Sequence, residues 1–296
     1  METEPNAGPG ELARGEPCNG RGSGHSPAAG PAPMLPMYDP SQPSGGPVPP
    51  YQPLPPAGQS LPPAGRGIHP RAAALIEVIA CSGLPTQLAI AGVLALAGIA
   101  PYDSQGRLSP AYVFALPLAD AVVLLTLITA FLHLHGESLS DLLGRRSVVF
   151  EGVVGLLHIP LVFLLAVTVM LAVRLFVPAL QDVERNPFES LVSSPANAWV
   201  FVLVAVIGGG VREEIQRAFI LHRFRQHLGG AAVGLVLFSL IFGLGHSLQG
   251  TDVAITTGVL GLFWGIVYLR RRSVVAPMVS HSGFNSAEIF RFAMFG

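Results

Sequence analysis

The stretch GVVGLLHIPLVFLLAVTVMLAVRLFV, residues 152–177, decides the fold class. It is apolar over its whole length apart from His158, Thr168 and Arg174. A helix needs about 20 mainly apolar residues to cross the hydrocarbon core of a bilayer. This stretch is long enough, and it therefore predicts a membrane-spanning helix.

Six further stretches carry the same signal. They are Ala72–Ala100, Ala111–Leu134, Ala198–Leu221, Ala231–Leu248, Val253–Leu269 and Val274–Phe295. Several contain Gly or Pro, which membrane helices tolerate better than soluble ones. We therefore predict an all-α fold, a polytopic transmembrane helix bundle over residues 71–296 with about seven helices. A partly inserted helix within Ser138–Val149 would raise the number to eight.

The composition agrees with this reading. Half of the residues are hydrophobic and 12% are charged, whereas a soluble domain carries about 25% charged residues. A formal net charge of -1 gives no basic surface for a nucleic acid, which is therefore not expected as a partner. The two cysteines, Cys18 and Cys81, make neither a disulfide framework nor a zinc ribbon.

Arginines gather in alternate loops of this predicted bundle. They precede the first predicted helix and follow the second, fourth and sixth: Arg66, Arg71, Arg145, Arg146, Arg223, Arg225, Arg270, Arg271 and Arg272. Cytoplasmic loops of membrane proteins carry this excess of positive charge. We therefore expect an integral protein of the bacterial inner membrane, embedded in the lipid bilayer, with its N-terminus in the cytoplasm.

Residues 1–70 differ from the rest, because Pro, Gly, Ser and Ala dominate them. Such a segment buries too little apolar surface to offset its chain entropy, so we predict a disordered cytoplasmic tail. Pro53-Leu54-Pro55-Pro56 could dock on a polyproline-recognising partner. Most tails of this composition have no such role, and both readings stay open.

Three polar clusters interrupt the apolar helices: Arg212–Arg217 (REEIQR), Phe242–His246 (FGLGH) and His281–Asn285 (HSGFN). An ionisable side chain within a bilayer costs at least about 2.5–3.5 kcal/mol, so function is the first hypothesis for such clusters. Taken singly, each also has a structural explanation. The first could close a helix at the membrane border, the second could be a packing histidine, and the third could be a polar seam between helices.

The clusters together predict hydrolytic chemistry. A glutamate beside a histidine can activate water as a general base, and an asparagine can donate a hydrogen bond to the oxyanion of a tetrahedral intermediate. Glu214, His246 and His281 could instead hold Zn²⁺ or another divalent metal, which takes three protein ligands and one water at catalytic sites. In both cases water attacks an amide.

These residues resemble the CPBP family of intramembrane proteases, also called the ABI family, which includes the type II CAAX prenyl endopeptidases. The family has Glu-Glu-x-x-x-Arg, Phe-x-x-x-His and His-x-x-x-Asn motifs in this order on separate membrane helices. The resemblance covers about residues 198–295. It implies cleavage of a membrane-associated peptide or protein substrate. It also implies that the site residues are Glu213, Glu214, Arg217, His246, His281 and Asn285.

The first motif departs from the family pattern. Two residues, not three, separate Glu214 from Arg217, and anchoring the motif on Arg217 places Arg212 where the family has its first glutamate. An alternative function is therefore a catalytically silent membrane scaffold or bacteriocin-immunity factor. A transporter fits less well, because the two halves of the chain hold no corresponding pair of broken helices.

The enzyme hypothesis requires the motifs to meet. We expect His246, His281 and at least one glutamate to converge with Asn285 beside them. Glu213 and Arg217 stand four apart on one helix face, so we expect them to pair, and Glu214 to lie nearer the water.

Two structural expectations accompany this site. For His246 to reach the depth of the other residues, its helix should begin before Ala231, through Gly229-Gly230. Asp120 stands alone in the second predicted helix, and we expect it to be a buried hydrogen-bond partner of Arg174.

Overall fold

The computed structural model describes residues 69–184, 186–192 and 194–295. All of them belong to the compact unit Pro62–Gly296. The predicted tail lies outside the described residues except for His69 and Pro70, so its disorder and its polyproline docking role stay predictions.

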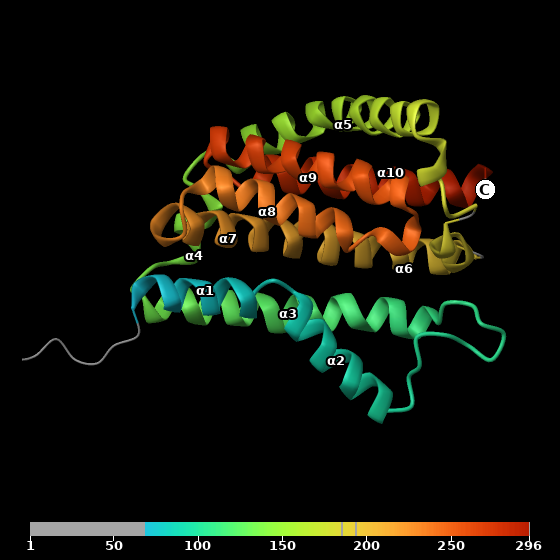
Figure 1. Ribbon diagram of the computed structural model, residues 1–296, viewed down its shortest axis with the longest axis horizontal. Helices are drawn as coiled ribbons and strands as arrows, with labels where there is room; N and C mark the ends of the chain where they lie inside the picture. Colours follow the sequence, from blue (N-terminus) through green and yellow to red (C-terminus); the bar gives the residue numbers. More distant parts are fainter. Residues whose placement is uncertain (1–68, 185, 193, 296) are drawn as a thin grey trace, which may run out of the picture. The chain divides into compact units, whose positions relative to one another are not determined.

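Every regular element of the described residues is a helix (Figure 1). The longer α-helices are α1 (Pro70–Ala80), α2 (Leu84–Leu96), α3 (Pro110–Leu134), α5 (Val148–Phe176), α6 (Pro195–Val204), α7 (Glu213–His227), α8 (Ala231–Leu244), α9 (Thr251–Arg271) and α10 (Val275–Phe295). Shorter elements are α4 (Leu139–Leu143), η1 (Pro178–Leu180), η2 (Pro187–Val192), the π-helical η3 (Ala205–Arg212) and η4 (Ser247–Gln249). The predicted all-α fold is confirmed for this part of the chain.

Each of the seven apolar stretches is helical, but fewer helices qualify as membrane spans by length and hydropathy. Three do so singly, namely α3, α5 and α9, and α1 with α2 makes a fourth if the pair, bent by 40°, is one span. The apolar α8 is only 14 residues long. A predicted count of seven or eight spans is therefore not confirmed.

Two of the predicted spans are built from more than one element. Gly83, with φ 89°, breaks the first span between α1 and α2. In the fourth span α6 continues through η3 into α7, because Ala205 and Glu213 keep right-handed helical dihedral angles. The chain from Pro195 to His227 is therefore one helical rod with a π-helical middle.

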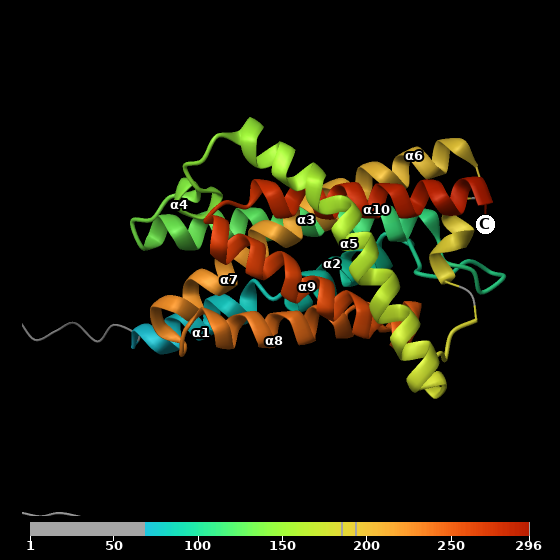
Figure 2. The same ribbon diagram turned by 90° about the horizontal axis from the view of Figure 1, so that it is seen from above.

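The π-helical segment η3 joins α6 to α7 and is packed between other helices of the bundle (Figures 1 and 2). It packs against α3 on one side and α10 on another, while α10 also packs along α5, and α8 packs along α9. Glycines allow the closest approaches: a Cβ at Gly243 of α8 would meet the carbonyl oxygen of Ala254 at 2.6 Å, and one at Gly155 of α5 would meet Val279 Cβ at 2.6 Å. Small residues serve the same purpose at helix contacts in membranes.

Side-chain burial follows the pattern of a protein in lipid. Apolar side chains of α5 such as Leu164 and Leu171 are exposed at its outer face, whereas Asp120, Glu214 and Arg217 are buried inside the bundle. Charged groups in membrane helices face the bundle interior and pair with one another. The apolar helices and the inward charges together describe an integral membrane protein.

Candidate functional site

The backbone of η3 forms one wall of the site. A π-helix is rare and often marks a functional position within an α-helix, and here it contains Gly208-Gly209-Gly210. A Cβ at Gly209 would lie 2.7 Å from Asn285 Nδ2 and 3.9 Å from His281 Nε2. The absence of a side chain at Gly209 therefore lets both polar groups of α10 approach the backbone of η3.

Glu214 is the buried centre of the site. Its side chain is 1% exposed, its Oε1 pairs with Arg217 on the same helix, and the same oxygen lies 2.8 Å from His281 Nδ1 on α10. The predicted pair of Glu213 with Arg217 is therefore wrong. Arg217 pairs instead with Glu214, three residues before it, which also shares its helix face.

Glu213 is the more accessible carboxylate, with 18% of its side chain exposed. Its Oε1 lies 3.5 Å from Arg212 Nη1, and its Oε2 lies 3.8 Å from His281 Nε2. The two glutamates thus approach opposite nitrogens of one imidazole. The expectation that Glu214 is the one nearer the water is not supported, since Glu214 is almost fully buried.

Trp264 of α9 fixes the plane of this imidazole. Its ring stacks on the His281 ring with centroids 3.8 Å apart and planes 17° apart. The indole nitrogen donates to Ser280 Oγ at 3.1 Å, and that hydroxyl donates to the carbonyl of Pro277 at 3.1 Å. The sequence alone does not indicate this role of Trp264, because a tryptophan between Gly261 and Gly265 is typical of close helix packing.

Aromatic rings surround Arg217. Its guanidinium carbon lies 5.2 Å from the ring centre of Phe238, 5.0 Å from that of Phe242 and 5.8 Å from that of Trp264. Such contacts attract a cation, which matters because Nε and Nη2 have no hydrogen-bond partner among the described residues. The rings and Glu214 together hold the buried charge in place.

Arg212 and Asp120 form a second buried pair beside Glu213. Asp120 of α3 pairs with Arg212 and also accepts from Thr86 and Gln87 at the start of α2. The predicted burial of Asp120 is confirmed, but its predicted partner is wrong, since Arg174 instead lies 3.2 Å from Asp252. The break at Gly83 permits this arrangement, because a Cβ there would lie 2.7 Å from Arg212 Nη2.

His246 forms no ion pair with a carboxylate among the described residues. It follows the end of α8, and its Nδ1 lies 2.8 Å from the carbonyl oxygen of Phe242. The Phe242 ring contacts both histidines, with its centre 4.9 Å from that of His246 and 6.1 Å from that of His281. Gly229 and Gly230 have φ 95° and 100°, so α8 begins at Ala231 and the predicted extension of this helix is wrong.

The residues do not fit the predicted metal site in this arrangement. Within 69–184, 186–192 and 194–295, no three His, Cys, Asp or Glu side chains are grouped as they would be around one metal ion. Glu214 is engaged by Arg217 and His281, while Nδ1 of His246 lies 2.8 Å from the carbonyl oxygen of Phe242. The Zn²⁺ hypothesis therefore has no preformed set of three ligands.

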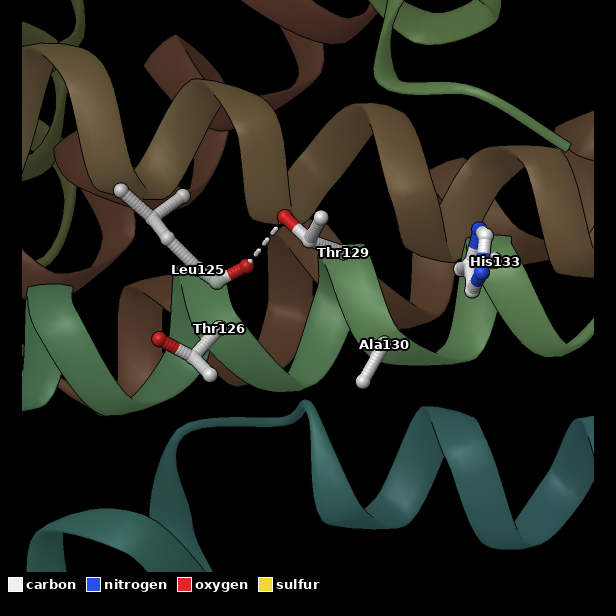
Figure 3. A pocket seen from close by; sticks show the side chains of 5 residues that line it. All are labelled: Leu125, Thr126, Thr129, Ala130 and His133. Carbon is white, nitrogen blue, oxygen red and sulfur yellow. Dashed lines mark hydrogen bonds between the residues drawn. The ribbon is translucent and has the colours of Figure 1, made fainter.

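A cavity of 520 Å³ lies elsewhere, along α3 (Figure 3). Leu125, Thr126, Thr129, Ala130 and His133 line it. The two threonine hydroxyls donate to the carbonyls of Val122 and Leu125, as Thr129 shows in Figure 3. The lining holds none of the motif residues, so this hollow is separate from the site on α7 and α10.

Comparison with known proteins identifies one part of the chain. Residues 195–287 match the model of the family described as type II CAAX prenyl endopeptidase Rce1-like. The match runs from the start of α6 into α10 and includes all six site residues. It confirms the resemblance seen in the motifs. No curated protein and no solved structure matches the chain.

Proposed function

We propose that this protein is an intramembrane endopeptidase of the CAAX type, which hydrolyses a peptide bond of a membrane-associated substrate with a water activated by Glu213 and His281. The observation that carries the proposal is the placement of one imidazole between two glutamates inside the segment that matches the protease family. The pairs of Glu214 with Arg217 and of Asp120 with Arg212 keep the neighbouring charges compensated.

The geometry supports Glu213 as the general base. The 3.8 Å between its Oε2 and His281 Nε2 exceeds a direct hydrogen bond but lies within the span that one bridging water covers. The ionised Glu214 accepts from His281, so Nδ1 carries a proton and Nε2 faces Glu213. Glu214 and Arg217 therefore position His281 and need not touch the substrate.

The reaction balances with these groups. The water oxygen bonds to the substrate carbonyl carbon while Glu213 takes one water proton, and the C–N bond then breaks as that proton passes to the leaving amine. Asn285 lies against the Gly209 backbone beside His281, where its Nδ2 can donate to the oxyanion of the intermediate. This assignment routes no step through a metal or through His246.

The second candidate is a catalytically silent membrane scaffold. One observation favours it: when the first motif is anchored on Arg217, Arg212 stands at the place of its first glutamate. A site that lost its catalytic set could keep the buried ion pairs for stability alone. This candidate needs no substrate, so a cleavage assay separates it from the endopeptidase.

The test uses the full chain reconstituted in vesicles with prenylated and unprenylated CAAX peptides. We expect Glu213→Gln to lower the cleavage rate by about 10²- to 10⁴-fold and Asn285→Ala by about 10²- to 10³-fold. The control is Glu288→Gln on α10, which removes only the partly exposed pair with Arg291 and should leave the rate unchanged. Cleavage that persists in Glu213→Gln would remove Glu213 as the base, and no cleavage by the native chain would favour the scaffold.

A further inference from the structure

The start of α5 and the end of α9 lie at the same end of the bundle, beside α4 (Figure 1). The loops at these ends are joined directly. Val274 N donates to Leu143 O at 3.3 Å, and a Cβ at Gly144 would collide with the carbonyl oxygen of Arg272. Both α5 and α9 are long and apolar enough to cross a membrane, so the joined loops lie where such helices leave the hydrocarbon core.

Five arginines gather on the joined loops. Arg145 and Arg146 come from the first loop, Arg270 and Arg271 end α9, and Arg272 begins the second loop. Glu151 binds Arg271 with two hydrogen bonds, at 2.6 and 2.7 Å, and lies 3.9 Å from Arg146. The other four arginines are exposed and form no closer ion pair with any described carboxylate. We call Arg145, Arg146, Arg270 and Arg272 the arginine rim.

The backbone of Arg272 adds an independent observation. With φ 55°, it is the one described residue other than glycine that has a positive φ. It caps the C-terminus of α9, a position where glycine is usual because it has no Cβ to strain. Arginine is strained at this position and glycine would not be, so the presence of an exposed arginine here indicates a role for its side-chain charge.

Apolar side chains lie beside the arginine rim. Val148, Val149 and Phe150 begin α5 directly after Arg146 and Ser147, and they are exposed at 67%, 78% and 57%. Exposed apolar side chains next to cationic ones match the border between acyl chains and headgroups. A free anion in water would use the charges and leave these side chains without a role.

We propose that the arginine rim is a binding site for the phosphate headgroups of anionic phospholipids. Arginines near a membrane surface attract anionic lipid, and a guanidinium presents a planar fork of donors to phosphate oxygens. The joined loops bring charges from two separate segments onto one surface, and Val148–Phe150 contact the acyl region beneath it. The inference does not depend on peptidase activity.

The experiment measures lipid retention by the purified full chain in non-ionic detergent, using native mass spectrometry with phosphatidylglycerol and phosphatidylcholine. We expect preferential retention of phosphatidylglycerol. The variant Arg145→Gln/Arg146→Gln/Arg270→Gln/Arg272→Gln should weaken it by roughly 600-fold, because each arginine contributes about fivefold. The control Arg107→Gln/Arg291→Gln removes two arginines that are paired with Asp103 and Glu288, and should retain the lipid.

Single variants of Arg272 keep the test informative if the fourfold variant fails to insert. Arg272→Gly relieves the positive φ and removes one charge, so it should unfold at a higher temperature in neutral detergent yet bind phosphatidylglycerol about fivefold more weakly. Arg272→Lys should keep most of the binding. Equal retention of both lipids by the native chain, or unchanged binding in Arg272→Gly, would overturn the proposal. Displacement of the lipid by millimolar inorganic phosphate would overturn the lipid assignment.

Discussion

Arg212 brings a positive charge into the interior of the bundle, where it pairs with Asp120 of α3. The Asp120 side chain is 1% exposed and the Arg212 side chain is 8% exposed. Arg212 also lies 3.5 Å from Glu213, so one guanidinium lies between a carboxylate of α3 and one of α7. Removing one member of such a set leaves an uncompensated buried charge.

This charge balance predicts how substitutions at Asp120 and Arg212 change the stability of the fold. Asp120→Asn should lower the free energy of unfolding by about 3–5 kcal/mol, because Arg212 then keeps only the longer contact with Glu213, at 3.5 Å. Adding Arg212→Gln to that variant should restore part of the loss, since the charge then left without its partner is that of Glu213, which is 18% exposed. Equilibrium unfolding in mixed micelles measures both effects as a double-mutant cycle.

The pair Asp103 and Arg107 provides the control for this cycle. It lies in the exposed turn after α2, where water screens the charges, so Asp103→Asn should change the unfolding transition little. If Asp120→Asn proved as mild as Asp103→Asn, the buried pair would contribute nothing to stability, and the account of Arg212 given above would be wrong.

At the scale of elements, the apolar stretches were predictable and the contacts between them were not. The length and apolar composition of Gly152–Val177 are enough to predict the helix α5. Spacing alone does not decide which glutamate pairs with Arg217, because Glu213 and Glu214 both share its helix face, four and three residues before it. His281 from α10 and the rings of α8 and α9 decide it, and they lie far away in sequence.

The π-helical geometry of η3 could not be predicted from the sequence either. Gly208-Gly209-Gly210 indicates close packing, but the change from α to π geometry depends on what packs against it. Here Asn285 and Ser282 of α10 fill the space that side chains at Gly209 and Gly210 would take. The sequence therefore indicated Glu214, His281 and Asn285 as candidates, but not the backbone surface against which Asn285 lies.

This surface gives the element-scale prediction. Gly209→Ala would place a Cβ 2.7 Å from Asn285 Nδ2, and a flexible amide can move away, so we expect folding to persist and peptide cleavage to fall by about 10²-fold. Gly210→Ala would meet Ser282 Cβ at 3.0 Å and Ser282 Cα at 3.3 Å, which no side-chain rotation relieves. That variant should lose about 1–3 kcal/mol of stability by overpacking.

Gly152→Ala on α5 is the matched control, because a Cβ there would meet nothing within 4 Å. In an open helical position alanine is favoured over glycine by up to about 1 kcal/mol, so this variant should be at least as stable as the native chain. Unfolding and cleavage measured side by side test all three variants. Full cleavage activity in Gly209→Ala would show that the position of Asn285 beside η3 is not needed.

At the scale of the whole molecule, a second ionic network joins helices at the end of the bundle away from η3. Arg223 of α7 lies 2.5 Å from Glu77 of α1 and 2.5 Å from Glu137, which follows α3. His222 and Gln226 also reach Glu137, at 2.8 and 2.6 Å. Three segments far apart in sequence are therefore held by two carboxylates around one arginine.

This network lowers the pKa of Glu137. Partial burial opposes its ionisation, but the hydrogen bonds from His222, Gln226 and Arg223 outweigh that effect and lower the pKa to about 2. A carboxyl with a depressed pKa stabilises the fold fully above the pKa of the unfolded chain, near 4.5, and loses this contribution as the pH falls towards 2. The contribution is about 1–2 kcal/mol once solvent screening at this half-buried site is allowed for.

Glu137→Gln should therefore unfold more readily than the native chain at pH 7, and the difference should shrink as the pH falls from 4.5 towards 2. Comparing the two proteins at each pH cancels the titration of the other carboxylates. Thermal unfolding between pH 7 and pH 2.5 measures the difference, with Glu184→Gln, an exposed loop position, as the control that should track the native chain throughout. A difference that stayed constant down to pH 2.5 would mean that Glu137 acts by shape and hydrogen bonding, with no contribution from its charge.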